Sequence, residues 1–159
     1  MSVLITAAND SAAFRLARIL NIDDICYASD MDMPVMFGKR FLKIPSADSP
    51  SFTHEVLKIC LDNRITEIFP LKQNEIKELS ASRQLFEEFG IKLVIPSIKW
   101  IEKRLNDLPL RSSNIFVMIN GTVCSGKSPV NDILPEDEDN GVFQWDLINE
   151  QLIFNSFFV

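Results

Sequence analysis

Short apolar runs alternate with segments of helical periodicity through the first two thirds of the chain. The run SVLIT at 2–6 is apolar and rich in β-branched residues, which is typical of a buried strand. The segment after it repeats apolar residues, among them Ala13, Leu16 and Leu20, at the spacing of one helical face. In chain order, the pattern predicts strands at 2–6, 24–29, 40–45, 66–70 and 91–96, and helices at 9–21, 49–63, 74–90 and 97–107.

Residues that favour helix ends stand at the limits of the predicted helices. Pro50 suits the first position of the helix at 49–63, directly after Ser49 as its cap. Gly90 is expected to stop the helix at 74–90, the longest of the four. The inward face of that helix is expected to carry Ile76, Leu79, Phe86 and Phe89. The other expected caps are Asn9, Asp10 or Ser11 for the first helix, with Asn21 at its end, and Ser97 for the last.

The front part predicts an α/β fold, and the rest predicts a β appendage. Continuously apolar strands that alternate with helices are typical of a parallel sheet covered on both faces, so residues 1–108 are expected to form a Rossmann-like, three-layer domain. After Pro109, strand-like runs are separated by turn signals at Asn120-Gly121, Gly126-Lys127 and Asn149-Glu150. We expect residues 109–159 to form an antiparallel appendage that packs on the domain as one compact unit and can extend its sheet edge.

The composition is that of a globular protein. The chain has 159 residues, 47% of them hydrophobic, and a net charge of −6. Its lysines and arginines form no basic run, so no nucleic acid is expected as a partner. No apolar stretch approaches the ~20 residues of a membrane span, and the N-terminus is interpreted as a core strand and not as a signal peptide. No membrane association is therefore expected.

The cysteines and one acidic run are the candidates for metal ligands in this sequence. Cys26, Cys60 and Cys124 lack the spacing of metal ligands, and their odd number favours a reduced, cytoplasmic setting, with Cys26 and Cys60 in the core. Carboxylates fill residues 136–139. We interpret this run as a solvated loop; a cation site is the alternative, but adjacent carboxylates do not by themselves supply coordination geometry. No metal is expected.

The stretch GTVCSGKS at 121–128 matches the phosphate-binding pattern G-x-x-x-x-G-K-[ST]. In such a loop Gly126, Lys127 and Ser128 would open a helix whose amides face the phosphates. Here Pro129 follows at once and the acidic run comes soon after, so at most one helical turn fits. We interpret the match as accidental and expect two turns that bracket a short strand, with Lys127 exposed. Direct ATP or GTP binding there is the alternative.

Polar residues follow the predicted strands at the edge where open α/β sheets bind ligands. The first strand leads into TAAND, which has no glycine, so NAD or FAD is not expected in the standard manner, and no other cofactor is expected either. The residues proposed for a ligand pocket at this edge are Thr6, Asn9, Asp10, Asp30, Gln73, Asn74 and Glu75. Loop capping is the alternative role for Asn9 and Asp30. No catalytic set is visible, and the lone His54 is expected on an exposed helix face.

Five segments stand in a characteristic order along residues 2–105: VLITAAND, ICYASD, KIPSADSPSF, ITEIFP and GIKLVIPS. Their informative positions are Asp30, Pro45, Phe52, Ile68, Pro70, Glu75, Gly90, Ile91, Pro96 and Ser97. This order resembles the N-terminal, pre-ATP-grasp domain of carboxylate–amine ligases of the carbamoyl phosphate synthase type. Two features depart from that family: the first loop lacks its usual glycine, and Gln73 stands about where the family places an Asp before Glu75.

The resemblance implies a ligase-related domain without the catalytic part. In that family ATP lies between two α+β subdomains that follow this domain, and roughly fifty residues after Leu108 are too few for either. We therefore expect a non-catalytic binding or interaction module for a small metabolite or a partner subunit. The alternative is one component of a split ATP-grasp ligase, with Mg-ATP on a separate subunit. The apolar tail LIFNSFFV packs on its own domain or forms an interface, and we expect a homodimer through the C-terminal β region.

Overall fold

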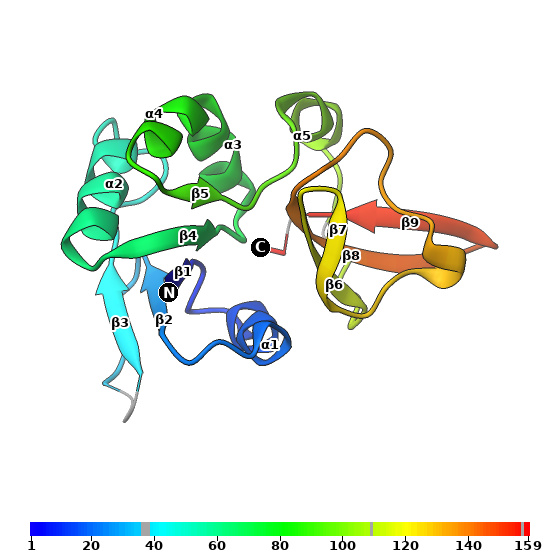
Figure 1. Cartoon of the computed structure of the whole chain (residues 1–159), viewed down its shortest axis with the longest axis horizontal. Helices are drawn as coiled ribbons and strands as arrows, with labels where there is room; N and C mark the ends of the chain where they lie inside the picture. Colours follow the sequence, from blue (N-terminus) through cyan, green and yellow to red (C-terminus); the bar gives the residue numbers. More distant parts are fainter. Residues whose placement is uncertain (36–38, 109, 157) are drawn as a thin grey trace.

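A computed structural model describes residues 1–35, 39–108, 110–156 and 158–159. Its larger sheet has five parallel strands in the order β3-β2-β1-β4-β5. The strands are β1 (Ser2–Ile5), β2 (Ile25–Ser29), β3 (Arg40–Lys43), β4 (Ile65–Phe69) and β5 (Lys92–Leu93). Helices lie on both faces of this sheet (Figure 1). The predicted α/β, Rossmann-like fold is confirmed.

The helices divide between the two faces. α1 (Ser11–Leu20) covers one face, and α2 (Phe52–Asp62), α3 (Gln73–Ala81) and α4 (Arg83–Glu88) cover the other; α5 (Ile98–Arg104) leads toward the C-terminal part (Figure 1). A hydrophobic cluster lies on each face of the sheet, and successive residues of β1 contribute to both. Val3 and Ile5 pack with α1, and Leu4 packs with α2 and α3. Because strand side chains alternate between faces, a strand covered on both sides is apolar throughout.

Two predicted N-caps and one predicted helix end are confirmed. The Asp10 side chain accepts a hydrogen bond from the amide of Ala12 at 2.8 Å, at the start of α1. Asn21 ends that helix in the left-handed region. The Ser97 hydroxyl accepts from the amide of Trp100 at 3.2 Å, at the start of α5. Both caps satisfy amides that have no partner inside their helix.

The helix expected at 74–90 is instead two helices, α3 and α4, which break at Ser82. The hydroxyl of Ser80 donates to the carbonyl three residues earlier, at 2.7 Å, and such local bonds compete with a continuing helix. Beyond the break, Phe89 is 52% exposed, so its predicted inward position is wrong. Gly90, the expected stop, does follow α4 in the left-handed region, with φ +72°.

Two further boundaries differ from the prediction. Ser49 and Pro50 lie in the turn before α2, with Ser51 at the N-cap position. The amide of Phe52 donates to the Ser49 carbonyl at 3.0 Å, so the proline belongs to this turn and does not open the helix. The strand expected at 91–96 is regular only over β5.

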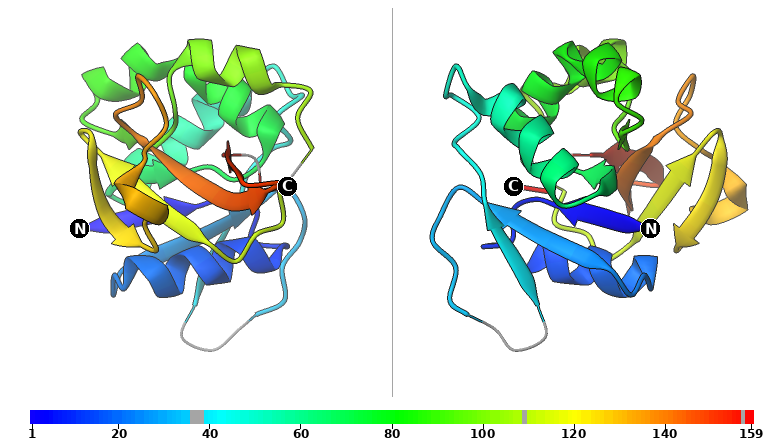
Figure 2. Two further views of the ribbon diagram at one scale, coloured as in Figure 1. Left: turned by 90° about the vertical axis from the view of Figure 1, so that its right-hand side faces the viewer. Right: turned by 60° about the vertical axis from the view of Figure 1, so that its left-hand side comes forward.

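The C-terminal part forms a second sheet, and the predicted antiparallel appendage is confirmed. Its strands, in the order β7-β6-β8-β9, are β6 (Ile115–Ile119), β7 (Thr122–Gly126), β8 (Gly141–Ile148) and β9 (Gln151–Asn155). Asn120-Gly121 and Asn149-Glu150 form the expected tight turns, with positive φ at both residues of each. This sheet is separate from the parallel one and lies beside it (Figure 2), so the expected extension of the sheet edge is wrong. Gly126-Lys127 is not a hairpin turn, because a long loop with a 3₁₀ turn at Val130–Asp132 follows β7.

Apolar packing joins the two sheets. The rings of Trp100 on α5 and Phe143 on β8 have centroids 5.5 Å apart, and Phe143 stacks on Phe116 of β6 at 5.4 Å. On the other side, Leu16 of α1 shares a core cluster with Val117 of β6. The domain limit expected between residues 108 and 109 therefore crosses continuous packing; Pro109 itself lies outside the described residues.

Candidate functional site

A polar cluster lies at the carboxyl ends of the central parallel strands. Thr6 follows β1, Asp30 follows β2, and Glu75 stands in the first turn of α3, after β4. The Thr6 hydroxyl donates to Glu75 Oε2 at 2.5 Å and accepts from the amide of Leu71 at 3.0 Å. Lys72 Nζ donates to Asp30 Oδ1 at 2.5 Å, in an ion pair whose side chains are 14% and 28% exposed. The structure thus brings three predicted residues together around a lysine.

Glu75 is the most buried ionisable residue of this cluster, at 2% exposure. Burial raises the pKa of the Glu75 carboxyl above its ordinary 4.5; the Thr6 hydrogen bond and the charge of Lys72 oppose the rise, and Asp30 adds to it. The site can therefore hold a proton at a pH where an exposed glutamate has lost it.

The remaining predicted residues make local hydrogen bonds. Asn9 Oδ1 accepts from the hydroxyl of Ser29 at 3.3 Å, which fastens the first loop to the end of β2, and Asp10 caps α1. Gln73 Nε2 donates to the carbonyl at the end of α5. Asn74 is exposed, and its Oδ1 accepts from the next amide at 2.9 Å. These contacts match the loop-capping alternative for Asn9 and hold the neighbouring elements in place.

The end of the chain covers this sheet edge. The amides of Phe158 and Val159 donate to the carbonyl of Leu71 at 3.0 and 3.2 Å, and the amide of Gln73 donates to Val159 O at 3.2 Å. The Phe158 side chain is buried in the cluster that contains Leu71. Figure 1 shows the C-terminus beside the tips of β1 and β4. These contacts match one of the two outcomes expected for the tail, packing on its own domain; Phe157 lies outside the described residues.

The segment that matches the phosphate-loop pattern belongs to a strand pair. Gly126 ends β7 with φ +91°, and any side chain there would collide with the carbonyl of Ile115 on β6. Lys127 is exposed, and its Nζ donates to Asn114 Oδ1 at 3.0 Å. Ser128 is followed by no α-helix in the described part of the loop. The glycine therefore serves close strand approach, and the helix N-terminus that a phosphate needs is not formed there.

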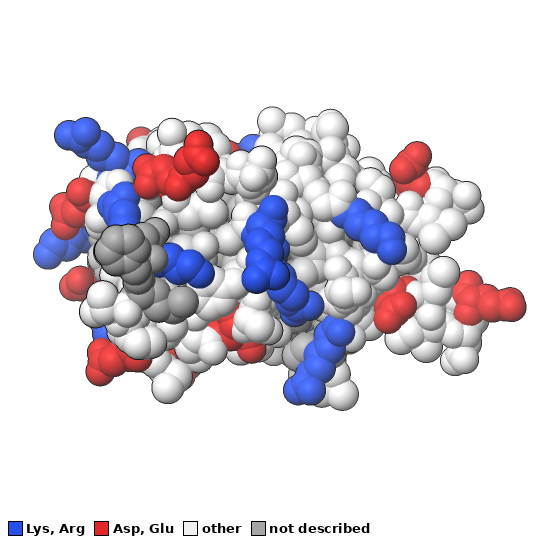
Figure 3. Space-filling view, turned by 90° about the horizontal axis from the view of Figure 1, so that it is seen from below, with Lys and Arg blue, Asp and Glu red and all other residues white. Residues whose placement is uncertain are grey.

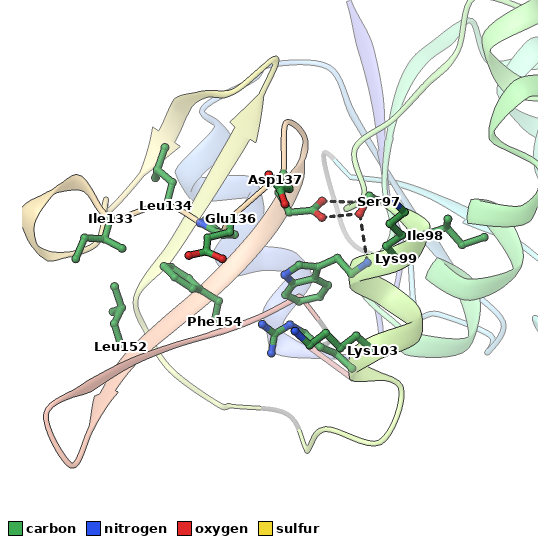
Figure 4. Close-up of a pocket in the computed structure, with 14 residues that line it drawn as sticks. Ser97, Ile98, Lys99, Lys103, Ile133, Leu134, Glu136, Asp137, Leu152 and Phe154 are labelled. Atoms are coloured by element: carbon green, nitrogen blue, oxygen red, sulfur yellow. Dashed lines mark hydrogen bonds between the residues drawn. The ribbon is translucent and has the colours of Figure 1, made fainter.

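A hollow of about 770 Å³ lies between α5 and the C-terminal part (Figure 4). Lys99, Lys103 and Arg104 contribute from α5. Glu136 and Asp137 contribute from the loop before β8. The apolar residues that line it are Ile98, Trp100, Ile133, Leu134, Pro135, Leu152 and Phe154. The hollow thus combines groups of both charges with an apolar lining.

One carboxylate of the acidic run lines this hollow and contacts the start of α5. Glu138 is buried, and its two oxygens accept hydrogen bonds from the amide and the hydroxyl of Ser97 at 2.6 and 2.5 Å. The prediction of a solvated loop is wrong for this residue, because the N-terminal amides of α5 attract a carboxylate. Within the described residues, no group of three or more metal-ligating side chains is found.

Sequence reasoning missed Lys72 in the polar cluster and the whole lining of the hollow, Glu138 included. Lys72 lies in the connection between β4 and α3 and adjoins Gln73, a predicted site residue, so its position in the sequence is a signal for it. Glu138 gave no such signal, since four carboxylates in a row are equivalent until the loop is placed against α5.

Comparison with known proteins decides the family. The sequence profile described as "PylC-like, N-terminal domain" matches residues 13–94, just over half of the chain. The chain belongs to this family. A PylC-like N-terminal domain is a pre-ATP-grasp domain of ATP-grasp ligases, so that part of the resemblance is confirmed, whereas the closer likeness to the carbamoyl phosphate synthase type stays a prediction. The matched part contains Asp30, Lys72 and Glu75, and the lining of the hollow lies entirely after it.

Two solved structures show low similarity to this PylC-like domain. One is a partial consensus L-threonine 3-dehydrogenase (E-change), with 14% identity and a TM-score of 0.45 over 58% of this chain and 35% of that one. The other is a GalE-like L-threonine dehydrogenase from Cupriavidus necator in its holo form, with 13% identity and a TM-score of 0.45 over 57% and 34%. The chain spans about a third of the length of these structures. No curated protein matches it.

Other expectations concern single residues. His54 is exposed on α2, as expected. All three cysteines are free, with Cys26 and Cys60 buried as predicted and Cys124 exposed. Among the helices of the described ranges, none has the length and apolar character needed to cross a bilayer.

Proposed function

We propose that this PylC-like N-terminal domain is a non-catalytic binding module that holds a small zwitterion with an apolar part in the hollow between α5 and residues 133–138. The observation that carries the proposal is the lining of this hollow, with cations from α5, carboxylates from the loop and apolar side chains beside them (Figure 4). A zwitterionic ligand can pair its carboxylate with the cations of α5 and its ammonium with the carboxylates of the loop. A ligand that carries only one sign of charge is repelled by the groups of the same sign.

The charges that line the hollow differ in how far they are already paired. The Arg104 guanidinium lies 4.6 Å from the ring centroid of Trp100 and forms a 3.5 Å ion pair with Asp107. Lys103 and Glu136, in contrast, form no ion pair within the described residues. Their charges are therefore available to a carboxylate and an ammonium of a ligand.

The place of the hollow also supports this proposal. All of its lining residues follow the family match at 13–94, so they lie outside the part that this chain shares with the family model. The polar cluster at the sheet edge is internally paired, Lys72 with Asp30 and Thr6 with Glu75, and residues 158–159 lie against that edge. The hollow is the better binding site of the two.

Isothermal titration calorimetry with free amino acids tests the proposal. Phenylalanine, leucine and glycine share the zwitterion and differ in apolar surface, so we expect affinity to fall in that order. Lys103→Gln and Glu136→Gln should each weaken phenylalanine binding by roughly fivefold, the size of an exposed ion pair. Lys58→Gln, an exposed position on α2, should leave it unchanged. The proposal is contradicted if none of the three amino acids binds saturably. It is also contradicted if Lys58→Gln weakens phenylalanine binding as much as Lys103→Gln does.

A second candidate function is one component of a split ATP-grasp ligase, with Mg-ATP bound by a separate subunit. Membership in a family of pre-ATP-grasp domains favours it. The test mixes the purified chain with an ATP-grasp protein from the same cell and measures ADP release. Turnover that requires both proteins supports the split enzyme; turnover that is unchanged by this chain supports the binding module alone.

We also propose that the protein forms a homodimer through the C-terminal β region, in the reducing cytoplasm. β9 pairs only with β8 within the described residues, and Leu147 and Ile148 before it are exposed apolar residues. The three free cysteines suit a reducing compartment. Analytical ultracentrifugation checks the assembly: a dimer that is weakened by Leu147→Asp supports it, and a monomer at every concentration contradicts it.

A further inference from the structure

A second hollow, of about 320 Å³, lies on the outer side of α1, away from the site proposed above. Ser11, Phe14, Arg15 and Arg18 line it at the spacing of one helical face, and Lys39 lines it from the connection between β2 and β3. Figure 3 looks onto this side of the molecule and shows Lys and Arg side chains across its middle, with acidic side chains mostly toward its margins. The hollow is thus a local concentration of positive charge on a protein whose net charge is −6.

The three cations of this hollow have no carboxylate partners among the residues that the structure describes. The ion pairs found there use other cations, namely Arg40, Lys43, Lys72 and Arg104. Within those residues, no ion pair neutralises the charge of Arg15, Arg18 or Lys39. Placing three like charges together costs free energy unless an anion compensates them.

Two of these cations are held in place by groups that do not neutralise them. Lys39 Nζ lies 4.1 Å from the ring centroid of Phe14 and 5.5 Å from that of Tyr27. Arg15 Nη1 donates to the carbonyl of Ser112 at 3.3 Å, whereas its Nε is buried without a hydrogen-bond partner in the described part of the chain. The guanidinium has five N–H donors, so its one contact to Ser112 leaves capacity for a further acceptor.

We propose that this hollow binds the phosphate group of a small phosphorylated molecule. Guanidinium groups match the geometry of phosphate oxygens and a lysine adds a point charge, so two arginines and a lysine form a suitable set. The Phe14 ring offers apolar contact to the rest of the ligand. The volume suits a small molecule, since nucleic acid or a membrane surface requires a broader array of cations.

Titration with inorganic phosphate and with phenyl phosphate at constant ionic strength, followed by NMR chemical shifts of the full chain, tests this site. We expect saturable binding of inorganic phosphate with shifts in α1. Arg18→Gln and Lys39→Gln, both at exposed positions, should each weaken it by roughly fivefold or more. Lys58→Gln removes the same charge from α2, on the opposite face of the sheet, and should have no effect.

The comparison of the two probes identifies the source of the phosphate group. Tighter binding of phenyl phosphate indicates a phosphate monoester whose body contacts Phe14, and equal binding indicates the free anion. The proposal is overturned if neither probe saturates, if the shifts lie outside α1, or if Lys58→Gln weakens binding as much as Arg18→Gln. Lys103→Gln, in the other hollow, should leave phosphate binding unchanged, so this test does not depend on the function proposed above.

Discussion

The carboxylate of Glu138 holds Ser97 by two hydrogen bonds, from the Ser97 amide at 2.6 Å and from its hydroxyl at 2.5 Å. Ser97 is also the N-cap of α5, since its hydroxyl oxygen accepts from the amide of Trp100. One side chain of the appendage loop therefore fixes the start of the helix that lines the 770 Å³ hollow. This contact therefore adds a polar link between the appendage loop and α5 to the apolar packing that joins the two sheets.

Loss of this contact should destabilise the protein. Glu138→Ala leaves the Ser97 amide and hydroxyl without their buried acceptor, so we expect a loss of about 1–3 kcal/mol in the free energy of unfolding. Glu136→Ala removes an exposed carboxylate from the same loop and should change it by less than about 0.5 kcal/mol. Urea denaturation measures the free energy of unfolding of both variants. Equal values for Glu138→Ala and Glu136→Ala would show that the hydrogen bonds between Glu138 and Ser97 do not stabilise the protein.

Glu75 should make stability depend on pH. Because its pKa in the folded protein lies above the ordinary 4.5, folding favours the protonated carboxyl. Its contribution to stability is fully present below pH 4.5 and is lost as the pH rises through the raised pKa. Glu75→Gln cannot ionise and keeps an acceptor for Thr6, so we expect it to match the wild type in acid and to exceed it at about pH 8.

Denaturation curves of the wild type and Glu75→Gln, recorded below pH 4.5 and at about pH 8, measure this effect. Glu78→Gln, at an exposed position on the same helix, is the control. The control should follow the wild type at both values. If instead the wild type gains stability over Glu75→Gln as the pH rises, the direction assigned to the pKa of Glu75 is wrong.

Gly126 should be required for the close pairing of β6 and β7. Gly126→Ala places a methyl group against the Ile115 carbonyl at φ +91°, so we expect it to cost about 2 kcal/mol or more. Gly90→Ala has a similar positive φ but open space around it, and should cost only about 1–2 kcal/mol. Thermal unfolding ranks the two variants, and a smaller cost at Gly126 contradicts the assigned role.

Mg-ATP titration completes the test of that segment. We expect no saturable binding to the wild type at Lys127, whose Nζ bonds to Asn114. Saturable binding that Lys127→Ala abolishes would show that the phosphate-loop pattern is functional after all.

The cysteines should differ sharply in reactivity. Burial raises the pKa of the Cys60 thiol to about 12, and Cys26 is equally inaccessible, whereas Cys124 is exposed. A thiol-specific reagent should therefore label Cys124 alone in the native protein and all three after unfolding. Mass spectrometry of the labelled peptides counts the modified thiols, and rapid native labelling of Cys60 contradicts the buried position.

The sequence was informative where local pattern and burial coincide. The run at 2–6 predicted β1 because Val3, Leu4 and Ile5 are divided between two covered faces, so every position of the strand is apolar. In a parallel sheet, the residues that follow the carboxyl ends of neighbouring strands lie at one edge. The sequence could therefore predict that Thr6, Asp30 and Glu75 lie close together, as they do in the structure.

Features set by distant contacts were not predictable in this way. The helix period continues through Ser82, yet the helix breaks there, and the next helix turns Phe86 into the core. Nothing in the acidic run distinguishes Glu138 until the appendage is folded back on α5. The basic hollow was equally hidden, since Lys39 is far from Arg18 along the chain.

The most direct test of the binding-module proposal is an NMR titration of the ¹⁵N-labelled chain with phenylalanine, mapped residue by residue. We expect saturable shifts in α5 and in residues 133–138, which line the hollow, with the amides around Thr6 and Glu75 unchanged. Shifts centred on the carboxyl ends of β1 and β4, or no shifts at millimolar phenylalanine, would contradict it.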